Sequence, residues 1–234
     1  MRLNKYLAHC EVGTRREADV LIKKGKVTVN GEIMLNPAYT VMGSDDIEYN
    51  GKSLTVKRDK VYILMNKPKV FSCNYDVDDH KSVAKILRPK IQNVVTVPVP
   101  LLNDDRGLIL LTDDKDVIKK IQEPGHRIKQ MYELTLNKEM DAKDMSGILD
   151  GIEINGVIEK IEGIAFVDDK PQNIVGVESH VINTDFLNML FDKQGYKIEI
   201  IDRMYIAGLT KKNLPRGFWR HLSKKETIFL RHFM

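Results

Sequence analysis

The chain has 234 residues, 42% of them hydrophobic and 30% charged, so it is long enough for one large core or two small ones. The formal net charge is +4 at pH 7, which is too small to indicate nucleic-acid binding by itself. Residues 1–30, however, contain seven Lys or Arg against three Asp or Glu, whereas the part after residue 60 is almost balanced. This distribution favours a phosphate-facing N-terminal module joined to a near-neutral second domain.

Composition also excludes several classes of protein. Cys10 and Cys73 lie far apart without CxxC or CxxH spacing, so neither a disulfide framework nor a zinc site is indicated. The six histidines are scattered singly, and we expect no metal ligand among them. No apolar run approaches the roughly 18 residues that a membrane-spanning helix needs, and the first residues do not form a signal peptide. We therefore expect a cytoplasmic protein without a metal centre and without membrane contact.

Two short helices are predicted at the N-terminus. Leu3, Tyr6 and Leu7 recur at helical spacing in the first. The second begins with a capping box, because the Thr14 hydroxyl can accept from a backbone amide three residues on while Glu17 reaches back to the cap. Its expected buried stripe is Ala18, Leu21 and Ile22, and Gly25 stands where a left-handed stop is expected.

Two hairpins should follow these helices. Residues 27–33 alternate around Asn30-Gly31, and residues 47–54 alternate around Asn50-Gly51. Both dipeptides favour the positive φ values of type I′ turns, which join two strands directly.

The order helix, helix, hairpin, hairpin resembles the αL RNA-binding domain named after small-subunit ribosomal protein S-four. The stretches RLNKYLA and TRREADVLIKKGKVTVNG carry this resemblance, and it implies an RNA-binding domain over residues 1–57. The candidate RNA-binding residues are Arg2, Lys5, Thr14, Arg15, Arg16, Lys23, Lys24, Lys26 and Asn30.

The chemistry of the second helix fits a phosphate. A helix N-terminus offers free amides and a partial positive charge, and Arg15 and Arg16 add guanidinium forks that match phosphate oxygens. The alternative is that these cations form an ordinary solvated face. Phosphate contacts do not identify bases, so the RNA sequence cannot be inferred.

The rest of the chain is predicted to be a second, α+β domain over residues 62–234, after a charged linker at 58–61. Irregularly mixed strands and helices favour the α+β class over a doubly wound sheet. We expect a mixed, mainly antiparallel sheet. The expected strands are 61–65, 94–99, 108–111, 131–136 and 197–201, and the expected helices are 82–87, 115–122, 141–149 and 185–193.

Two motifs stand out in this domain. Asn66-Lys67-Pro68 is similar to the element LNKPxG, with Val70 in place of its Gly. The C-terminal signature LxRxRIGxLxLGxLPxGxWRxLTxxE is matched at Arg203, Ile206, Leu209, Leu214, Pro215, Gly217, Trp219, Arg220, Leu222 and Glu226. Through these motifs the domain resembles the ribosomal RNA pseudouridine synthases, the group of small-subunit synthase A and large-subunit synthases B, E and F.

The resemblance implies a reaction. Members of the group bind a folded RNA, flip one uridine into a cleft, detach its base with an Asp carboxylate and rejoin it through carbon, without metal or cofactor. It also implies partners: ribosomal RNA or a preribosomal particle, with ribosomal proteins as possible further contacts. We expect the chain to be a monomer.

The catalytic loop of the group, GRLDxDxxG, has its counterpart in the stretch 97–112. Counting back without gaps from Gly107 places the catalytic Asp on Leu102 and the second Asp of the motif on Asp104. A shift of one residue would put the catalytic position on Asn103, which is not a carboxylate either.

Other pocket positions also depart from the group. Tyr132 falls on the tyrosine that stacks under the base, although a retained core aromatic is the favoured interpretation, and Gln130 occupies a usual Lys position. The expected arginines of the loop and of the helix motif NRQIRRM fall on Pro100, Asp185, Asn188 and Met189. Asp185 would repel a phosphate that an arginine attracts.

These departures predict an RNA-binding protein of the synthase type that is no longer catalytic and is bound to ribosomal RNA or assembling ribosomes. A first alternative is an active synthase that uses Asp104 or Asp105 in a rebuilt pocket. A second is a permanent structural component of the ribosome, which would stay bound at high salt where a transient factor is released.

Overall fold

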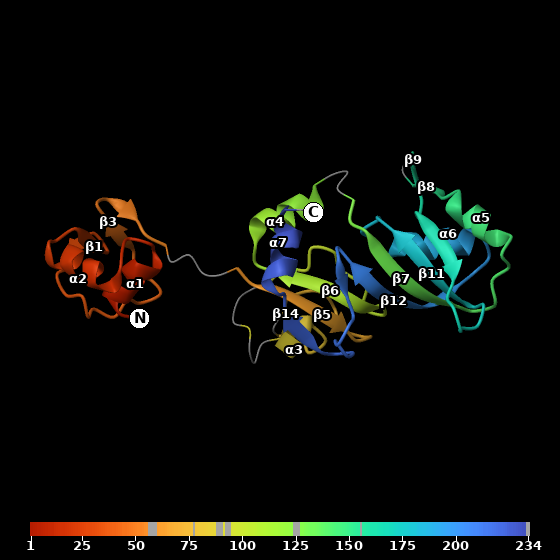
Figure 1. Ribbon diagram of the computed structural model, residues 1–234, viewed down its shortest axis with the longest axis horizontal. Coiled ribbons are helices and arrows are strands. Elements are labelled where there is room, and N and C mark those ends of the chain that lie inside the picture. Colours follow the sequence, from red (N-terminus) through yellow and green to blue (C-terminus); the bar gives the residue numbers. More distant parts are fainter. Residues whose placement is uncertain are drawn as a thin grey trace. The chain divides into compact units, whose positions relative to one another are not determined.

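The computed structural model describes residues 1–55, 60–76, 78–87, 91, 95–123, 127–154 and 156–232 (Figure 1). The chain divides into two compact units, Met1–Asp59 and Lys60–Met234. Within the described residues, no helix is both long and apolar enough to cross a bilayer.

The first unit contains two helices and two hairpins in the predicted order. Its elements are α1 (Leu3–His9), α2 (Arg15–Lys23), β1 (Val27–Val29), β2 (Glu32–Ile33), β3 (Ile47–Tyr49) and β4 (Lys52–Ser53), and the strands form one sheet in the order β2-β1-β3-β4. Asn30 and Asn50 have φ values of 54° and 49°, which confirms both Asn-Gly turns. The capping box is also present: Thr14 N donates to Glu17 Oε2 at 2.7 Å, and Glu17 N donates to Thr14 Oγ1 at 3.3 Å.

The second unit is built on a mainly antiparallel sheet in the order β10-β11-β7-β12-β6-β5-β14, with β13 added to β12. Only β12 and β6 pair in parallel among these strands, through Asp202 with Arg106 and Arg203 with Gly107. The elements are β5 (Tyr62–Lys67), α3 (Val83–Leu87), β6 (Arg106–Thr112), α4 (Lys115–Gln122), β7 (Gln130–Leu136), α5 (Asp144–Leu149), β8 (Ile152–Ile154), β9 (Val157–Glu159), β10 (Gly163–Phe166), β11 (Ile174–Ser179), α6 (Asp185–Lys193), β12 (Ile198–Ile206), β13 (Leu209–Thr210), β14 (Trp219–His221) and α7 (Lys224–His232).

The two halves of this sheet are covered differently (Figure 1). Strands β5 and β6 are buried on both faces, because α4 and α7 pack on one face and the larger core lies on the other. Strand β7 alternates instead: Tyr132, Leu134 and Leu136 point into the core with α5 and α6, whereas the residues between them are at least partly open to solvent. One face of this half of the sheet therefore meets water, as is common in antiparallel sheets.

The predicted elements of this unit are mostly present with altered ends, but the strand expected at 94–99 is wrong for the residues that can be judged. Residue 94 lies outside the described residues, and 95–99 contribute only a bridge between Thr96 and Thr112. Pro98 and Pro100 have no backbone N–H, so this segment cannot continue a hydrogen-bonded ladder. The helix expected at 141–149 is shorter and begins at Asp144. The α+β class with a mainly antiparallel sheet is confirmed.

Gly107 is the residue that lets β6 and β12 approach each other. Its φ is +119°, and a Cβ built on it would lie 2.4 Å from both the backbone N and the backbone O of Arg203. No side chain fits at this distance, so the parallel contact between the two strands requires glycine at position 107.

Substitution Gly107→Ala should therefore destabilise the second unit by about 2–5 kcal/mol, because backbone strain and steric overlap add. Gly195→Ala is the matched control: its φ is also positive, at +74°, but nothing lies within 4 Å of the added Cβ. We expect the control to lose only about 1–2 kcal/mol. Urea unfolding followed by circular dichroism measures both, and equal losses would contradict the close-approach argument.

Candidate functional site

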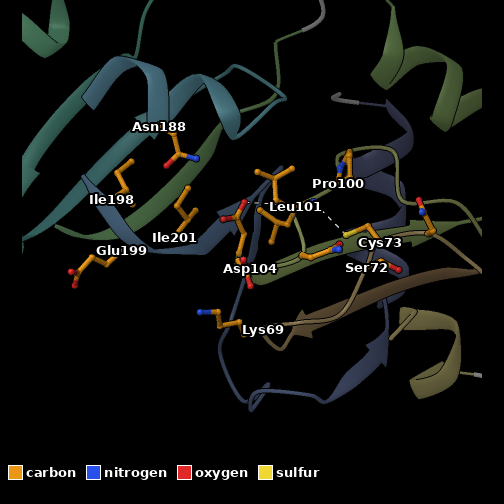
Figure 2. A pocket seen from close by; sticks show the side chains of 14 residues that line it. Lys69, Ser72, Cys73, Pro100, Leu101, Asp104, Asn188, Ile198, Glu199 and Ile201 are labelled. Atoms are coloured by element: carbon orange, nitrogen blue, oxygen red, sulfur yellow. Dashed lines mark hydrogen bonds between the residues drawn. The ribbon is translucent and has the colours of Figure 1, made fainter. Parts of the chain in front are cut away.

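The loop that corresponds to the catalytic motif borders a cavity of about 570 Å³ (Figure 2). Figure 2 shows Asn188, Ile198 and Ile201 of α6 and β12 on one side of it and the loop residues Pro100 and Leu101 on the other. Leu102 also lines the cavity, and its side chain is 39% exposed. An alkyl group therefore stands in the cavity wall at the position expected for the catalytic carboxylate.

Two buried cations, Lys67 and Arg203, donate hydrogen bonds to backbone carbonyls of the loop and its flanks. The Lys67 ammonium donates to the carbonyl oxygens of Asn103 at 3.1 Å and Asp105 at 2.6 Å. Arg203 is fully buried, and its Nη2 donates to Val99 O at 2.9 Å while its Nε donates to Leu108 O at 2.7 Å. Burial lowers the pKa of Lys67, although nearby acidic groups oppose this shift. Both ends of the loop are thus fixed by hydrogen bonds to backbone carbonyls.

Asp105 is a structural carboxylate of this loop. Its side chain is only 6% exposed, and Oδ2 accepts from Thr184 Oγ1 at 2.6 Å and from the backbone N of Leu102 at 3.2 Å. Burial raises the pKa of Asp105 above its ordinary value, because desolvation disfavours the charged form more than these hydrogen bonds favour it. The contact to Thr184 connects the loop to the start of α6.

Asp104 differs from Asp105 in its exposure and in its hydrogen bonding. It is exposed, it lines the cavity near Lys69 in Figure 2, and within the described part of the chain its carboxylate has no hydrogen bond or ion pair. Of the two alternative carboxylates, Asp104 is the one that a ligand in the cavity can reach.

Tyr132 does not line this cavity. It is 2% exposed, and its hydroxyl donates to Gln130 Oε1 at 2.7 Å, an oxygen that also accepts from Arg203 Nη1 at 2.7 Å. A lysine at position 130 could not accept either bond and would bring a second cation to Arg203. The glutamine therefore locks Arg203 and Tyr132 into the core.

The residues that line the cavity include three acids, Asp104, Asp105 and Glu199, and one base, Lys69. Two further cations, Lys67 and Arg203, lie close enough to Asp105 to affect its pKa. Glu199 stands at a shift of register in β12, between Ile198 and Ile200, which is an irregularity that redirects side chains. The exposed carboxylates of Asp104 and Glu199 oppose the phosphate of a flipped nucleotide.

The helix positions at which the sequence comparison expected arginines are divided between cavity and surface. Asn188 of α6 lines the cavity, whereas Asp185 and Met189 are exposed and are not part of its lining. Within the described residues, no group of three or more His, Cys, Asp or Glu side chains is arranged to hold a metal ion.

The first unit carries its cations on the surface. Arg15 and Arg16 are exposed at the start of α2, and the other predicted basic residues are exposed as well, namely Arg2, Lys5, Lys23, Lys24 and Lys26. The two polar candidates are used internally. Thr14 caps α2, and the Asn30 amide donates to Asp45 Oδ1 at 3.1 Å and accepts from Asp46 N at 2.9 Å.

Comparison with known proteins agrees with both units. Residues 1–47 match the S4 domain family. The large-subunit pseudouridine synthase B of Bacillus subtilis is 32% identical over 98% of this chain and 95% of its own length. The chain belongs to the ribosomal RNA pseudouridine synthase family. An RNA pseudouridine synthase of Aquifex aeolicus is 27% identical over 97% of this chain and 92% of its own length.

A solved structure has the same fold. The crystal structure of a pseudouridylate synthase has a TM-score of 0.66 with this chain at 24% identity, covering 98% of this chain and 99% of its own. The S4 domain makes RNA the partner class of this family member.

The contacts of several residues that organise the site were not predicted from the sequence. Lys67 and Arg203 were noted as motif residues, but their hydrogen bonds to the loop depend on carbonyls more than 30 residues away. The Asp105–Thr184 contact joins residues 79 positions apart and has no local signal. The NKP motif preceding the loop was the only available pointer to Lys67.

The raised pKa of Asp105 predicts a pH effect on stability. The folded chain keeps this proton at pH values where the unfolded chain has lost it, so the stability linked to Asp105 is greatest below about pH 4 and falls as pH rises through the folded-state pKa. Asp105→Asn removes this titration but keeps an acceptor oxygen for Thr184 and Leu102. The stability of the variant relative to the wild type should increase between pH 4 and pH 7 in urea unfolding. A relative stability that stays constant or decreases would contradict the shift.

Proposed function

We propose that this member of the family binds ribosomal RNA or an assembling ribosomal particle and does not isomerise uridine. The observation that carries the proposal is Leu102, whose alkyl side chain lines the cavity where the family's reaction needs a carboxylate. A leucine can neither attack a sugar carbon nor accept a proton. The acidic lining supports the same conclusion, because a nucleotide entering the cavity would bring its own negative charge.

In this proposal the chain works as a monomer in the cytoplasm. Residues 1–57 form the RNA-binding domain, 58–61 a linker, and 62–234 a synthase-like domain that serves as a docking surface for RNA or ribosomal proteins. The large-subunit pseudouridine synthase B of Bacillus subtilis supports ribosomal RNA as the target. The RNA contact itself is assigned to Arg15, Arg16 and the neighbouring basic residues, with Thr14 and Asn30 shaping the surface that carries them.

A second candidate function is an active synthase based on Asp104. The observation that favours it is the exposed Asp104 carboxylate, which lines the cavity without a partner in the described part of the chain. Against it stands geometry: a carboxylate two residues from the catalytic position is displaced by several ångströms, whereas reacting atoms must be held within about 3–3.5 Å. Asp105 is a weaker candidate, because Thr184 and Leu102 already occupy its Oδ2.

Pure protein should form no detectable pseudouridine in ribosomal RNA. Loss of a nucleophile lowered the rate of a well-studied hydrolase on the order of a millionfold, so residual turnover is not expected. Carbodiimide mapping of RNA from cells with and without the gene, and of RNA treated with pure protein, provides the measurement. A pseudouridine that disappears with the gene and returns with the protein would overturn the proposal, and its loss with Asp104→Asn would establish the second candidate.

Restoring the carboxylate alone should not restore activity. Leu102→Asp returns the acid to the cavity wall, but positions 100 and 188 still lack the arginines that the family uses there, and the lining becomes more acidic. The same mapping checks this variant. Activity in Leu102→Asp would mean that the leucine is the only obstacle to catalysis.

RNA binding should depend on the first unit. The double substitution Arg15→Ala and Arg16→Ala should weaken binding similarly for different RNA sequences and reduce the slope of log affinity against log salt by about one to two units. The control is Lys115→Ala with Lys119→Ala, which removes the same charge from the exposed side of α4. Fluorescence titration at several salt concentrations measures both, and equal effects would contradict the assignment.

A further inference from the structure

A second basic cluster lies in the synthase-like unit, outside the cavity. It consists of Arg106 at the start of β6, Lys211 after β13 and Arg216 before β14, gathered around Asp202 of β12. Three cations thus surround one carboxylate. Asp202 is buried, and although burial raises its pKa, the hydrogen bonds from Arg216 and Lys211 outweigh this and hold the pKa below its ordinary value.

Two of the cations already satisfy Asp202. Lys211 donates to Oδ1, and Arg216 donates to Oδ1 through Nη1 at 3.2 Å and to Oδ2 through Nη2 at 2.5 Å. Arg216 also donates to Asn66 Oδ1 at 2.7 Å, which fixes it against β5. These two side chains have a structural task.

The third cation, Arg106, makes no hydrogen bond to Asp202. Arg106 Nε lies 3.9 Å from Asp202 Oδ2, which is too far for a hydrogen bond, and among the described residues its guanidinium has no acceptor at all. Its Nε is shielded from solvent while unpaired, which is unfavourable for a polar group. The side chain is nevertheless 36% exposed, so an external acceptor can reach it.

The cluster and the cavity lie on opposite faces of the sheet. In β12, Ile201 pairs with Leu134 and lines the cavity, whereas its neighbour Asp202 pairs with Glu133 on the solvent-facing side. Arg106 shares that side, because it is the parallel partner of Asp202.

Two further ion pairs lie on this side: Lys170 pairs with Glu133 at 2.5 Å, and Lys129 pairs with Glu178 at 2.7 Å. The cluster adds three cations and one carboxylate, which is a surplus of positive charge. Burial lowers the pKa of Lys211 and the nearby Arg216 adds to this effect, although Asp202 opposes both.

We propose that Arg106, Lys211 and Arg216 form a second RNA contact, which binds a backbone phosphate on the face of the sheet opposite the cavity. The proposal rests on the RNA-binding part of the proposed function and holds whether or not the chain is catalytic. A phosphate supplies two oxygens to the unoccupied fork of Arg106 and offsets the surplus charge, which is the recognition that guanidinium groups favour. The contact does not read bases, so it adds affinity without sequence preference.

Arg106→Gln tests the contact with little risk to the fold, because Arg106 makes no hydrogen bond within the described residues. The full chain is titrated with a labelled RNA hairpin of arbitrary sequence at several salt concentrations. The slope of log affinity against log salt should fall by about 0.7–0.9, which corresponds to about fivefold to eightfold weaker binding at 0.1 M salt. Arg106→Lys keeps the charge and should keep the slope.

The matched control is Arg127→Gln, which removes the same charge from an exposed side chain that Glu162 already pairs. Unfolding midpoints confirm that each variant is folded. Coincident titrations of Arg106→Gln and Arg127→Gln would overturn the proposal and leave the cluster as a counter-charge for Asp202. This experiment measures only RNA binding. Detection of pseudouridine would therefore overturn the proposed loss of catalysis but would leave the evidence for this RNA contact unchanged. Repeating the titration in the Arg15→Ala, Arg16→Ala background should give the same loss, because the two contacts act independently.

Discussion

The guanidinium of Arg203 lies fully buried, and its three hydrogen bonds go to Val99 O, Leu108 O and Gln130 Oε1. A buried charge is tolerated only when its donors are satisfied, so the surrounding elements must keep their positions relative to it. Those elements are the loop before β6, β6 itself and β7. The buried Lys67 ammonium likewise donates to the carbonyl oxygens of Asn103 and Asp105, which lie between Val99 and Leu108. The shape of the loop therefore depends on two buried cations and on backbone carbonyls, and not on the side chain at position 102.

This arrangement separates the residues that hold the fold together from the residues that line the cavity. Gly107, Lys67 and Arg203 are needed for the packing of β6 against β12 and for the loop, whereas Leu102, Pro100 and Asn188 line the cavity. Fold and reaction are separable, because the fold depends on buried contacts and the reaction on a few exposed groups.

Acidic and basic side chains of the second unit are also separated, because they gather on opposite faces of the sheet. The cavity carries carboxylates from the loop and from the irregular part of β12, whereas the opposite face carries the cluster around Asp202. The alternation of side chains along a strand allows this, because neighbours such as Ile201 and Asp202 point to opposite faces. An acidic cavity and a basic surface can therefore occur on opposite faces of one sheet. Salt screens the attraction between their charges when the separation exceeds the Debye length.

The sequence by itself determined the local features of this protein: the capping box at Thr14 and the turns at Asn30-Gly31 and Asn50-Gly51. These features depend on residues only a few positions apart, so they can be recognised from the sequence alone. Only the tertiary structure decided that Tyr132 is buried with Gln130 and Arg203, that Asp105 bonds to Thr184, and that three cations meet at Asp202. Each of these joins residues from different strands or helices, and which side chains become neighbours depends on how the strands pair and pack, which local patterns do not contain.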